Sequence, residues 1–165
     1  MIPGRATGIL LLGSQVLLGC APGMPIKTDF DADEYARFEA DGSGSISGTA
    51  LVRGVSGNAK PGALRPVYLD PVTSYSTEWF EKMVRWYGRV RFRPLHPGFA
   101  AHRRETVADL DGRFRFDRLP AGDYFLTCDM WKSYAVVEVG GFGFARIALR
   151  EGEQLEDVSL AVGRR

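Results

Sequence analysis

The chain has 165 residues, a formal net charge of +1 and two cysteines. The near-neutral charge provides no overall field for a nucleic acid, and two cysteines cannot form a disulfide framework. The length suits one domain with a single hydrophobic core after removal of a short leader.

The first twenty residues predict a secretory leader. Arg5 supplies a positive charge, and residues 8–19 form a short apolar run that ends directly before Cys20. This order is typical of a signal peptide, and the run is shorter than the roughly 20 apolar residues that cross a bilayer. We therefore expect a signal peptide over residues 1–19.

The end of this run, Leu17-Leu18-Gly19-Cys20, resembles the lipobox of bacterial lipoproteins. The resemblance implies that Cys20 carries a diacylglyceryl group and becomes the first residue of the mature protein. The alternative is a simple secretory peptide in which Cys20 has no role. In the resembled class an Asp after the cysteine favours retention in the inner membrane, and Ala21 stands there instead. We therefore expect a periplasmic lipoprotein anchored in the outer membrane, with membrane contact through its lipid alone.

Residues 20–43 are predicted to be a tether followed by an acidic linker. Residues 21–28 contain two prolines and a glycine, and residues 29–41 contain six acidic residues. The spacing of the aspartates suggests calcium, but the sixth and twelfth positions of an EF-hand loop are occupied by Glu34 and Ala40. A solvated linker is the preferred interpretation, in which Phe30, Tyr35 and Phe38 can form one short helical face.

Residues 44–163 are predicted to form the folded body. Alternating apolar residues predict strands. The predicted strands cover residues 45–52, 66–70, 104–110, 113–117, 124–131, 134–139, 145–149 and 158–162, with an edge strand or extended loop over 89–93. Asp111-Gly112 predicts a β-hairpin, and the glycine-rich stretch 140–144 predicts a second hairpin turn.

One helix is predicted over Thr77–Tyr87, capped by Ser76 or Thr77 and ended by Gly88. Its apolar residues recur at helical spacing and are expected to pack on the body. These residues are Trp79, Phe80, Met83, Val84 and Tyr87. Trp86 lies off this stripe and is predicted to be an exposed aromatic residue.

The stretch 106–126 resembles the signature of carboxypeptidase regulatory-like domains. The matching elements are Thr106, Asp109, Asp111-Gly112, Phe114, Phe116, Leu119-Pro120-Ala121-Gly122 and Tyr124. The resemblance implies an all-β, transthyretin-like (prealbumin-like) antiparallel β-sandwich of about seven strands with one inserted helix. It also implies a non-catalytic accessory module and leaves the ligand undefined.

The sequence presents no constellation for catalysis, for a cofactor or for a metal. His96 and His102 are six residues apart, whereas a helix would place two ligands three or four apart and a strand two apart. Cys128 alternates with Tyr124, Leu126 and Met130, so it is expected to be a small buried hydrophobe rather than a reactive thiol.

A basic stretch follows the predicted helix. Four arginines follow residue 82 with no acidic residue among them, namely Arg85, Arg89, Arg91 and Arg93. They are a candidate patch for an anionic glycan or an envelope protein. The alternative is a solvated face, or pairing with the acidic segment 29–41.

The predicted function is therefore that of a non-catalytic, lipid-anchored envelope protein that acts as a binding or structural module. A second hypothesis is a component of a secretion apparatus, similar in plan to the small lipoprotein of type VI secretion. A hydrolase is the least expected function, because the sequence contains no Gly-x-Ser-x-Gly nucleophile elbow, although a catalytic triad whose members are distant in the chain would leave no local motif.

Overall fold

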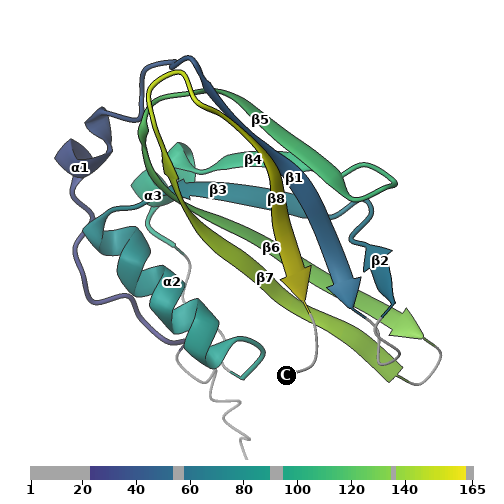
Figure 1. Ribbon diagram of the computed structural model, residues 1–165. Coiled ribbons are helices and arrows are strands. Elements are labelled where there is room, and N and C mark those ends of the chain that lie inside the picture. Colours follow the sequence, from purple (N-terminus) through teal and green to yellow (C-terminus); the bar gives the residue numbers. More distant parts are fainter. Residues whose placement is uncertain (1–22, 54–57, 90–94, 135–136, 163–165) are drawn as a thin grey trace, which may run out of the picture.

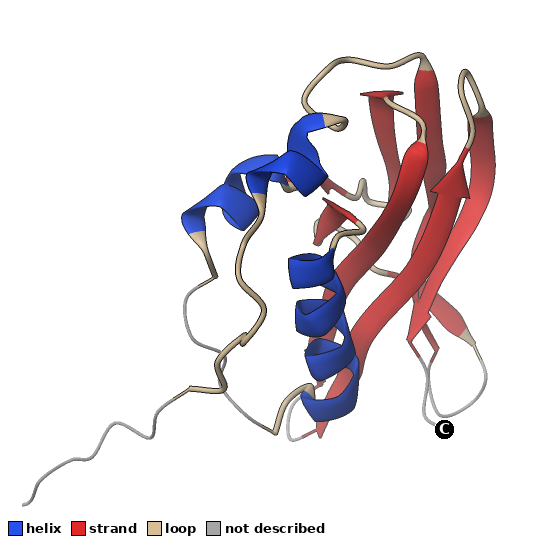
Figure 2. Ribbon diagram, turned by 90° about the vertical axis from the view of Figure 1, so that its left-hand side faces the viewer, coloured by secondary structure: helices blue, strands red, loops and turns tan. Residues whose placement is uncertain are grey.

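The computed structural model describes residues 23–53, 58–89, 95–134 and 137–162. Two four-stranded sheets pack face to face, and three helices lie outside one of them (Figures 1 and 2). The prediction of a mostly β, two-sheet sandwich is confirmed. Within the described residues, no helix has the length and hydropathy needed to span a bilayer.

The first sheet is built around β1 (Gly44–Arg53). This strand pairs antiparallel with β5 (Arg113–Leu119) and with the short β2 (Ala59–Pro61), and it pairs parallel with β8 (Gln154–Val162). The second sheet has the order β4-β3-β6-β7 and is antiparallel throughout. Its strands are β4 (Arg104–Val107), β3 (Pro66–Pro71), β6 (Gly122–Tyr134) and β7 (Val137–Leu149).

The described residues form eight strands, and the β1–β8 pair departs from the predicted antiparallel arrangement. The reason is that the chain changes sheets between β7 and β8. A parallel neighbour requires a crossover rather than a tight hairpin. The C-terminal strand thereby enters beside β1 in the same direction (Figure 1).

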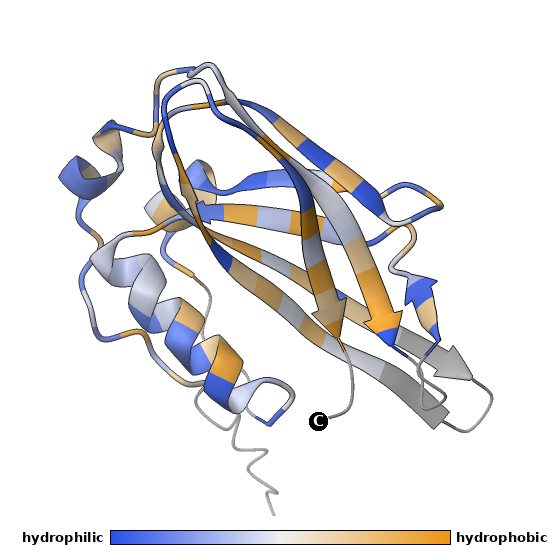
Figure 3. Cartoon of the chain, in the orientation of Figure 1, coloured by the Kyte–Doolittle hydropathy of each residue, from blue (hydrophilic) through white to orange (hydrophobic). Residues whose placement is uncertain are grey.

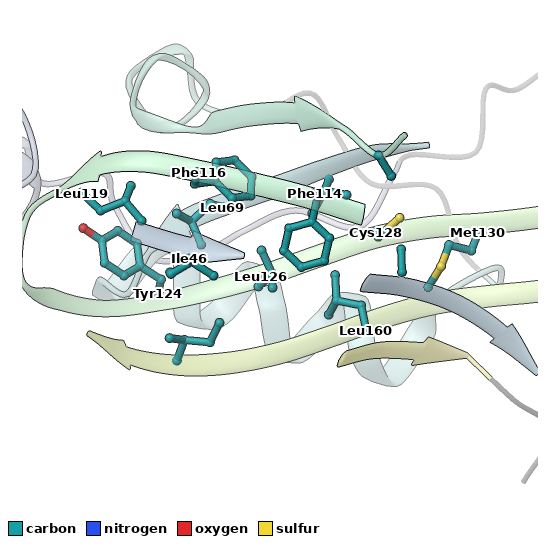
Figure 4. Close-up of a cluster of buried hydrophobic side chains, with 14 of the residues drawn as sticks. Ile46, Leu69, Phe114, Phe116, Leu119, Tyr124, Leu126, Cys128, Met130 and Leu160 are labelled. Atoms are coloured by element: carbon teal, nitrogen blue, oxygen red, sulfur yellow. The ribbon is translucent and has the colours of Figure 1, made fainter. Parts of the chain in front are cut away.

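Alternating residues from both sheets fill the space between them. In β5, Phe114 and Phe116 point inward and are 4% and 5% exposed (Figure 4), while Arg113 and Arg115 are solvent-exposed. The hydropathy of the residues alternates along this strand (Figure 3). Full burial of one such side chain contributes about 1.5–3 kcal/mol to folding. Cys128 lies in the same core with no exposed surface, which confirms its predicted burial.

The turn at Asp111-Gly112 is present, but it does not join a hairpin. Strand β4 belongs to the second sheet and β5 to the first, so the turn carries the chain between layers. The Asp109 carboxylate accepts hydrogen bonds from the backbone N–H groups of Asp111 and Arg113 at 2.9 and 2.8 Å. Gly112 has φ +79°, which suits a residue without a side chain. The local turn was therefore predictable, whereas the partner of each strand was not.

The predicted turn at residues 140–144 is wrong, because these residues lie within the continuous strand β7. Gly140 pairs with Trp131, and Gly141 pairs with Met130. A Cβ atom on Gly140 would lie 1.9 Å from the Met130 carbonyl oxygen, and one on Gly143 would lie 2.5 Å from Met130 Cε. These glycines permit close approach inside a sheet rather than reversal of the chain.

Helix α2 spans Ser74–Trp86 and begins three residues before the predicted start. Its cap is Thr73, whose hydroxyl accepts from the N–H of Ser76, while the Ser76 hydroxyl accepts from the N–H of Thr73. This reciprocal capping box satisfies two backbone donors at once. Gly88 follows the helix with φ +71°, and Trp86 is 38% exposed as predicted.

The segment before β1 differs from the predicted solvated linker. It contains α1 (Ala32–Ala36), and its Tyr35 and Phe38 side chains are buried. Most of its acidic side chains remain exposed to solvent, as the acidic composition predicted, whereas its aromatic side chains anchor the segment to the folded body. Phe38 packs edge-on against Tyr124, with ring centroids 5.3 Å apart.

The helices lie over the outer face of the second sheet (Figure 2). A second hydrophobic cluster fills the space between them and that face. Its buried members are Tyr35, Tyr75, Trp79 and Phe99. Phe99 comes from α3 (Pro97–His102), a helix that the sequence pattern left unassigned. The molecule thus has three layers: sheet, sheet and helices.

Candidate functional site

A cleft of about 330 Å³ lies between α2 and the outer face of the second sheet. Its aromatic lining comes from Tyr68, Trp79, Tyr87 and Phe142, and its charged or hydroxyl-bearing lining comes from Arg65, Arg103, Thr127 and Asp129. This size falls at the lower end of the range for small-molecule sites, and an apolar lining with a few polar groups is their usual composition.

Aromatic contacts hold α2 against the sheet beside the cleft. The ring of Phe80 stacks on Phe125 at 4.0 Å with an interplanar angle of 7°. At the end of the helix, Tyr87 stacks on Phe142 at 5.0 Å. The helix is therefore fixed at two points, and the cleft is a formed feature of the packing rather than a loose gap.

The register of the sheet places the polar residues side by side. Thr127 of β6 pairs with Tyr68 of β3, and Asp129 of the same strand pairs with Phe142 of β7. Residues two apart on a strand share a face, so Thr127 and Asp129 both lie on the outer face. The opposite face of β6 carries Leu126 and Cys128 into the inter-sheet core.

One wall is set by a buried ion pair. Asp70 has no exposed surface, and its carboxylate accepts from Nε and Nη2 of Arg103 at 2.8 and 2.9 Å. Desolvation raises the pKa of Asp70, and the hydrogen bonds and charge of Arg103 oppose that rise. The guanidinium carbon also lies 4.7 Å from the ring centre of Tyr68 and 4.9 Å from that of Trp79. Arg103 is thus held rigidly, with its charge balanced by Asp70.

The rim carries a chain of hydrogen bonds. The Tyr87 hydroxyl donates to Asp129 Oδ1, and Trp131 Nε1 donates to the Tyr87 hydroxyl at 2.6 Å. Burial, followed by the bond to Asp129, raises the pKa of Tyr87. Arg65 Nη2 donates to the carbonyl of Trp131, whose indole is 38% exposed. An aromatic surface therefore continues from the cleft to solvent.

Thr127 is the exception to this pattern of satisfied polar groups. The residue is 1% exposed, and its hydroxyl is the one buried side-chain polar atom without a hydrogen-bond partner in the part of the chain that the structure describes. Leaving a buried hydroxyl unpaired costs about 1–3 kcal/mol. A cleft residue that carries this cost is a candidate ligand contact.

The described residues that were predicted from sequence as sites lie elsewhere. Arg85 and Arg89 are exposed, within and just after the C-terminal end of α2, and neither lines the cleft. Cys20, Arg91 and Arg93 lie outside the described residues. Sequence reasoning missed the cleft, although β6 carries Phe125, Thr127, Asp129 and Trp131 on its second face. Two aromatic residues on that face were the available signal that another layer covers it.

The two histidines come close to the same aromatic ring but form no metal site. His96 stacks on Phe30 at 4.6 Å, and His102 lies 6.2 Å from that ring. His102 Nε2 is 3.5 Å from Glu39 Oε1. Within the described ranges, no group of three or more His, Cys, Asp or Glu residues could hold a metal ion. Neither histidine lines the cleft under α2.

No protein-family model and no curated protein matches the chain. The fold is similar to a crystal structure from Pseudomonas aeruginosa described as a "putative carbohydrate binding protein". The two share 27% sequence identity with a TM-score of 0.72, over 82% of this chain and 99% of that one. The arrangement of strands and helices is therefore one that a solved protein also adopts.

Proposed function

We propose that the protein is a non-catalytic carbohydrate-binding module and that the cleft between α2 and the second sheet is its binding site. The observation that carries the proposal is the combination of aromatic rings with polar side chains fixed by their neighbours. A sugar offers C–H groups to aromatic faces and hydroxyls to polar groups, so this lining matches it chemically. The similarity to the Pseudomonas aeruginosa protein supports the same ligand class.

A glycan array followed by titration calorimetry tests the proposal. We expect Tyr87→Ala to weaken binding of the best ligand about tenfold or more, because the change removes one of the aromatic rings that line the cleft and the hydrogen-bond partner of Asp129. Trp86→Ala is the matched control, since this neighbouring aromatic residue lies outside the cleft. Equal loss in both variants, or failure of every glycan to bind, would contradict the proposal.

The likeness to carboxypeptidase regulatory-like domains remains part of the proposal for the fold. It is supported by the Asp109-centred turn, by the inward position of Phe114 and Phe116, and by Tyr124. The Tyr124 hydroxyl donates to the carbonyl of Pro120 at 2.7 Å, which secures the corner where the chain changes sheets.

Attachment through a lipid on Cys20 completes the proposed function, because it would hold the binding module at the periplasmic side of the outer membrane. Fractionation of the expressed protein and of Cys20→Ser tests this point: the wild type should pellet with membranes and the variant should be soluble. Membrane retention of Cys20→Ser would refute anchoring. The secretion-apparatus hypothesis stays a prediction, for which a single defined crosslinking partner of α2 would be required.

A further inference from the structure

The charges around the cleft occur as opposite pairs. Arg103 is neutralised by Asp70, which is fully buried behind it. At the mouth, Arg65 is accompanied by Asp129, and Glu105 lies beside Tyr68 through the β3–β4 pairing. Within the lining of the cleft, an anionic ligand would meet Asp129 and a cationic ligand would meet Arg65, while the charge of Arg103 is already balanced by Asp70. The charges that surround the cleft therefore favour neither a positive nor a negative ligand.

The polar groups have unused hydrogen-bonding capacity of several kinds. A guanidinium has five N–H donors, and the structure shows one donor of Arg65 bonded to Trp131. Asp129 uses one oxygen to accept from Tyr87 and keeps the other. The Thr127 hydroxyl, which can donate and accept, is unpaired. Donors, an acceptor and a hydroxyl together suit a ligand that carries several hydroxyl groups.

We propose that the cleft selects a neutral sugar unit, with one sugar hydroxyl bonded to Thr127 and others bonded to Asp129 and Arg65 at the mouth. This inference rests on the proposed carbohydrate-binding function and names the class of sugar. The small volume limits the ligand to one or two rings, with any longer chain extending over the exposed indole of Trp131.

Thr127 provides the sharper half of the test. Thr127→Val keeps the shape of the side chain and removes the hydroxyl. We expect the variant to bind a neutral sugar about tenfold more weakly and to melt at a higher temperature than the wild type when unliganded, because a buried unpaired hydroxyl is lost. Thr127→Ser keeps the hydroxyl and should retain sugar binding. A lower melting temperature of Thr127→Val with unchanged binding would show that the hydroxyl is structural, and would overturn the inference.

Ligand charge provides the other half. The probes are methyl glycosides of neutral hexoses, the matching uronates and the matching amino sugars, titrated into the full chain. We expect the neutral glycosides to bind about tenfold or more tightly than either charged series. Tighter binding of a uronate that is still lost in Tyr87→Ala would overturn the neutral class and leave the proposed function intact. Absence of binding by every sugar would overturn both.

Discussion

The two buried layers of this protein differ in chemistry. The inter-sheet core consists of aliphatic and aromatic side chains with one thiol, whereas the layer under the helices contains most of the buried polar groups. Five polar or charged residues are buried in the described part of the chain, and four of them lie in the helical layer: Asp70, Thr73, Ser76 and Thr127. The fifth is Ser45. Polar groups in a low-dielectric layer are costly unless they are paired. The inter-sheet core therefore specifies the sandwich, and the helical layer is where the fold can recognise a ligand.

The largest expected loss of stability comes from the inter-sheet core. Phe116→Ala should lower the free energy of unfolding by about 3–5 kcal/mol, because a cavity remains between two packed sheets. Urea denaturation measures this loss. In the fraction that stays folded, affinity for a sugar should be unchanged. A loss below 1 kcal/mol, within the range of surface substitutions, would show that Phe116 is not part of a tight core.

Arg103→Ala should produce a comparable loss for a different reason. The substitution leaves the buried carboxylate of Asp70 unpaired, which costs about 3–5 kcal/mol at neutral pH. Without Arg103 the pKa of Asp70 should rise further, and the folded state then binds a proton more tightly than the unfolded state. The deficit should therefore shrink as the pH falls, which denaturation at several pH values would reveal. A deficit independent of pH would contradict the assignment of the loss to Asp70.

The N-terminal segment offers a smaller, local test of the helical layer. The carboxylate of Glu78 accepts from the backbone N–H groups of Lys27 and Thr28 and from Lys82. Desolvation raises the pKa of Glu78, but these hydrogen bonds outweigh it and lower the pKa to about 2. The ionised carboxylate therefore stabilises the docked segment fully at pH values above 4.5, the ordinary pKa of this group. This contribution disappears as the pH falls through the lowered pKa of about 2.

Amide chemical shifts of Lys27 and Thr28 should therefore titrate with a midpoint near that of Glu78, while the amide of Ala50, which donates to the backbone carbonyl of Gly112, stays constant. In Glu78→Gln, both amides should show at neutral pH the chemical shifts that they have in the wild type when Glu78 is protonated. A midpoint at the ordinary carboxyl value would show that the segment does not dock on α2 through this carboxylate.

The exposed arginines are expected to matter least. Replacing Arg85, Arg89, Arg91 and Arg93 by Glu should weaken retention on an anionic column and leave the binding of a neutral sugar unchanged. Arg85 and Arg89 are solvent-exposed, where single charges contribute little to stability. A loss of neutral-sugar binding in this variant would place the site at the end of α2 rather than in the cleft.

The sequence predicted the inner core better than the outer layer. Alternation in β5 identified Phe114 and Phe116 as inward-facing, because a strand with one wet face carries a clear period of two. In β6 both faces are covered, so Thr127 and Asp129 had no pattern that distinguished a cleft from solvent. The glycines of β7 resembled a turn because their use depends on Met130, a residue of the neighbouring strand. Pairings and layers of this kind are set by contacts distant in sequence.

The central claim is that the helical layer binds a carbohydrate in the cleft under α2. Titration of the ¹⁵N-labelled protein with a neutral methyl hexoside tests it most directly. We predict that amide shifts will change at Tyr68, Tyr87, Thr127 and Asp129, while those of Ser47, Thr49 and Arg113, which line a separate cleft on the first sheet and its edge, will not. Changes confined to that other cleft, or no change at a saturating sugar concentration, would contradict the claim.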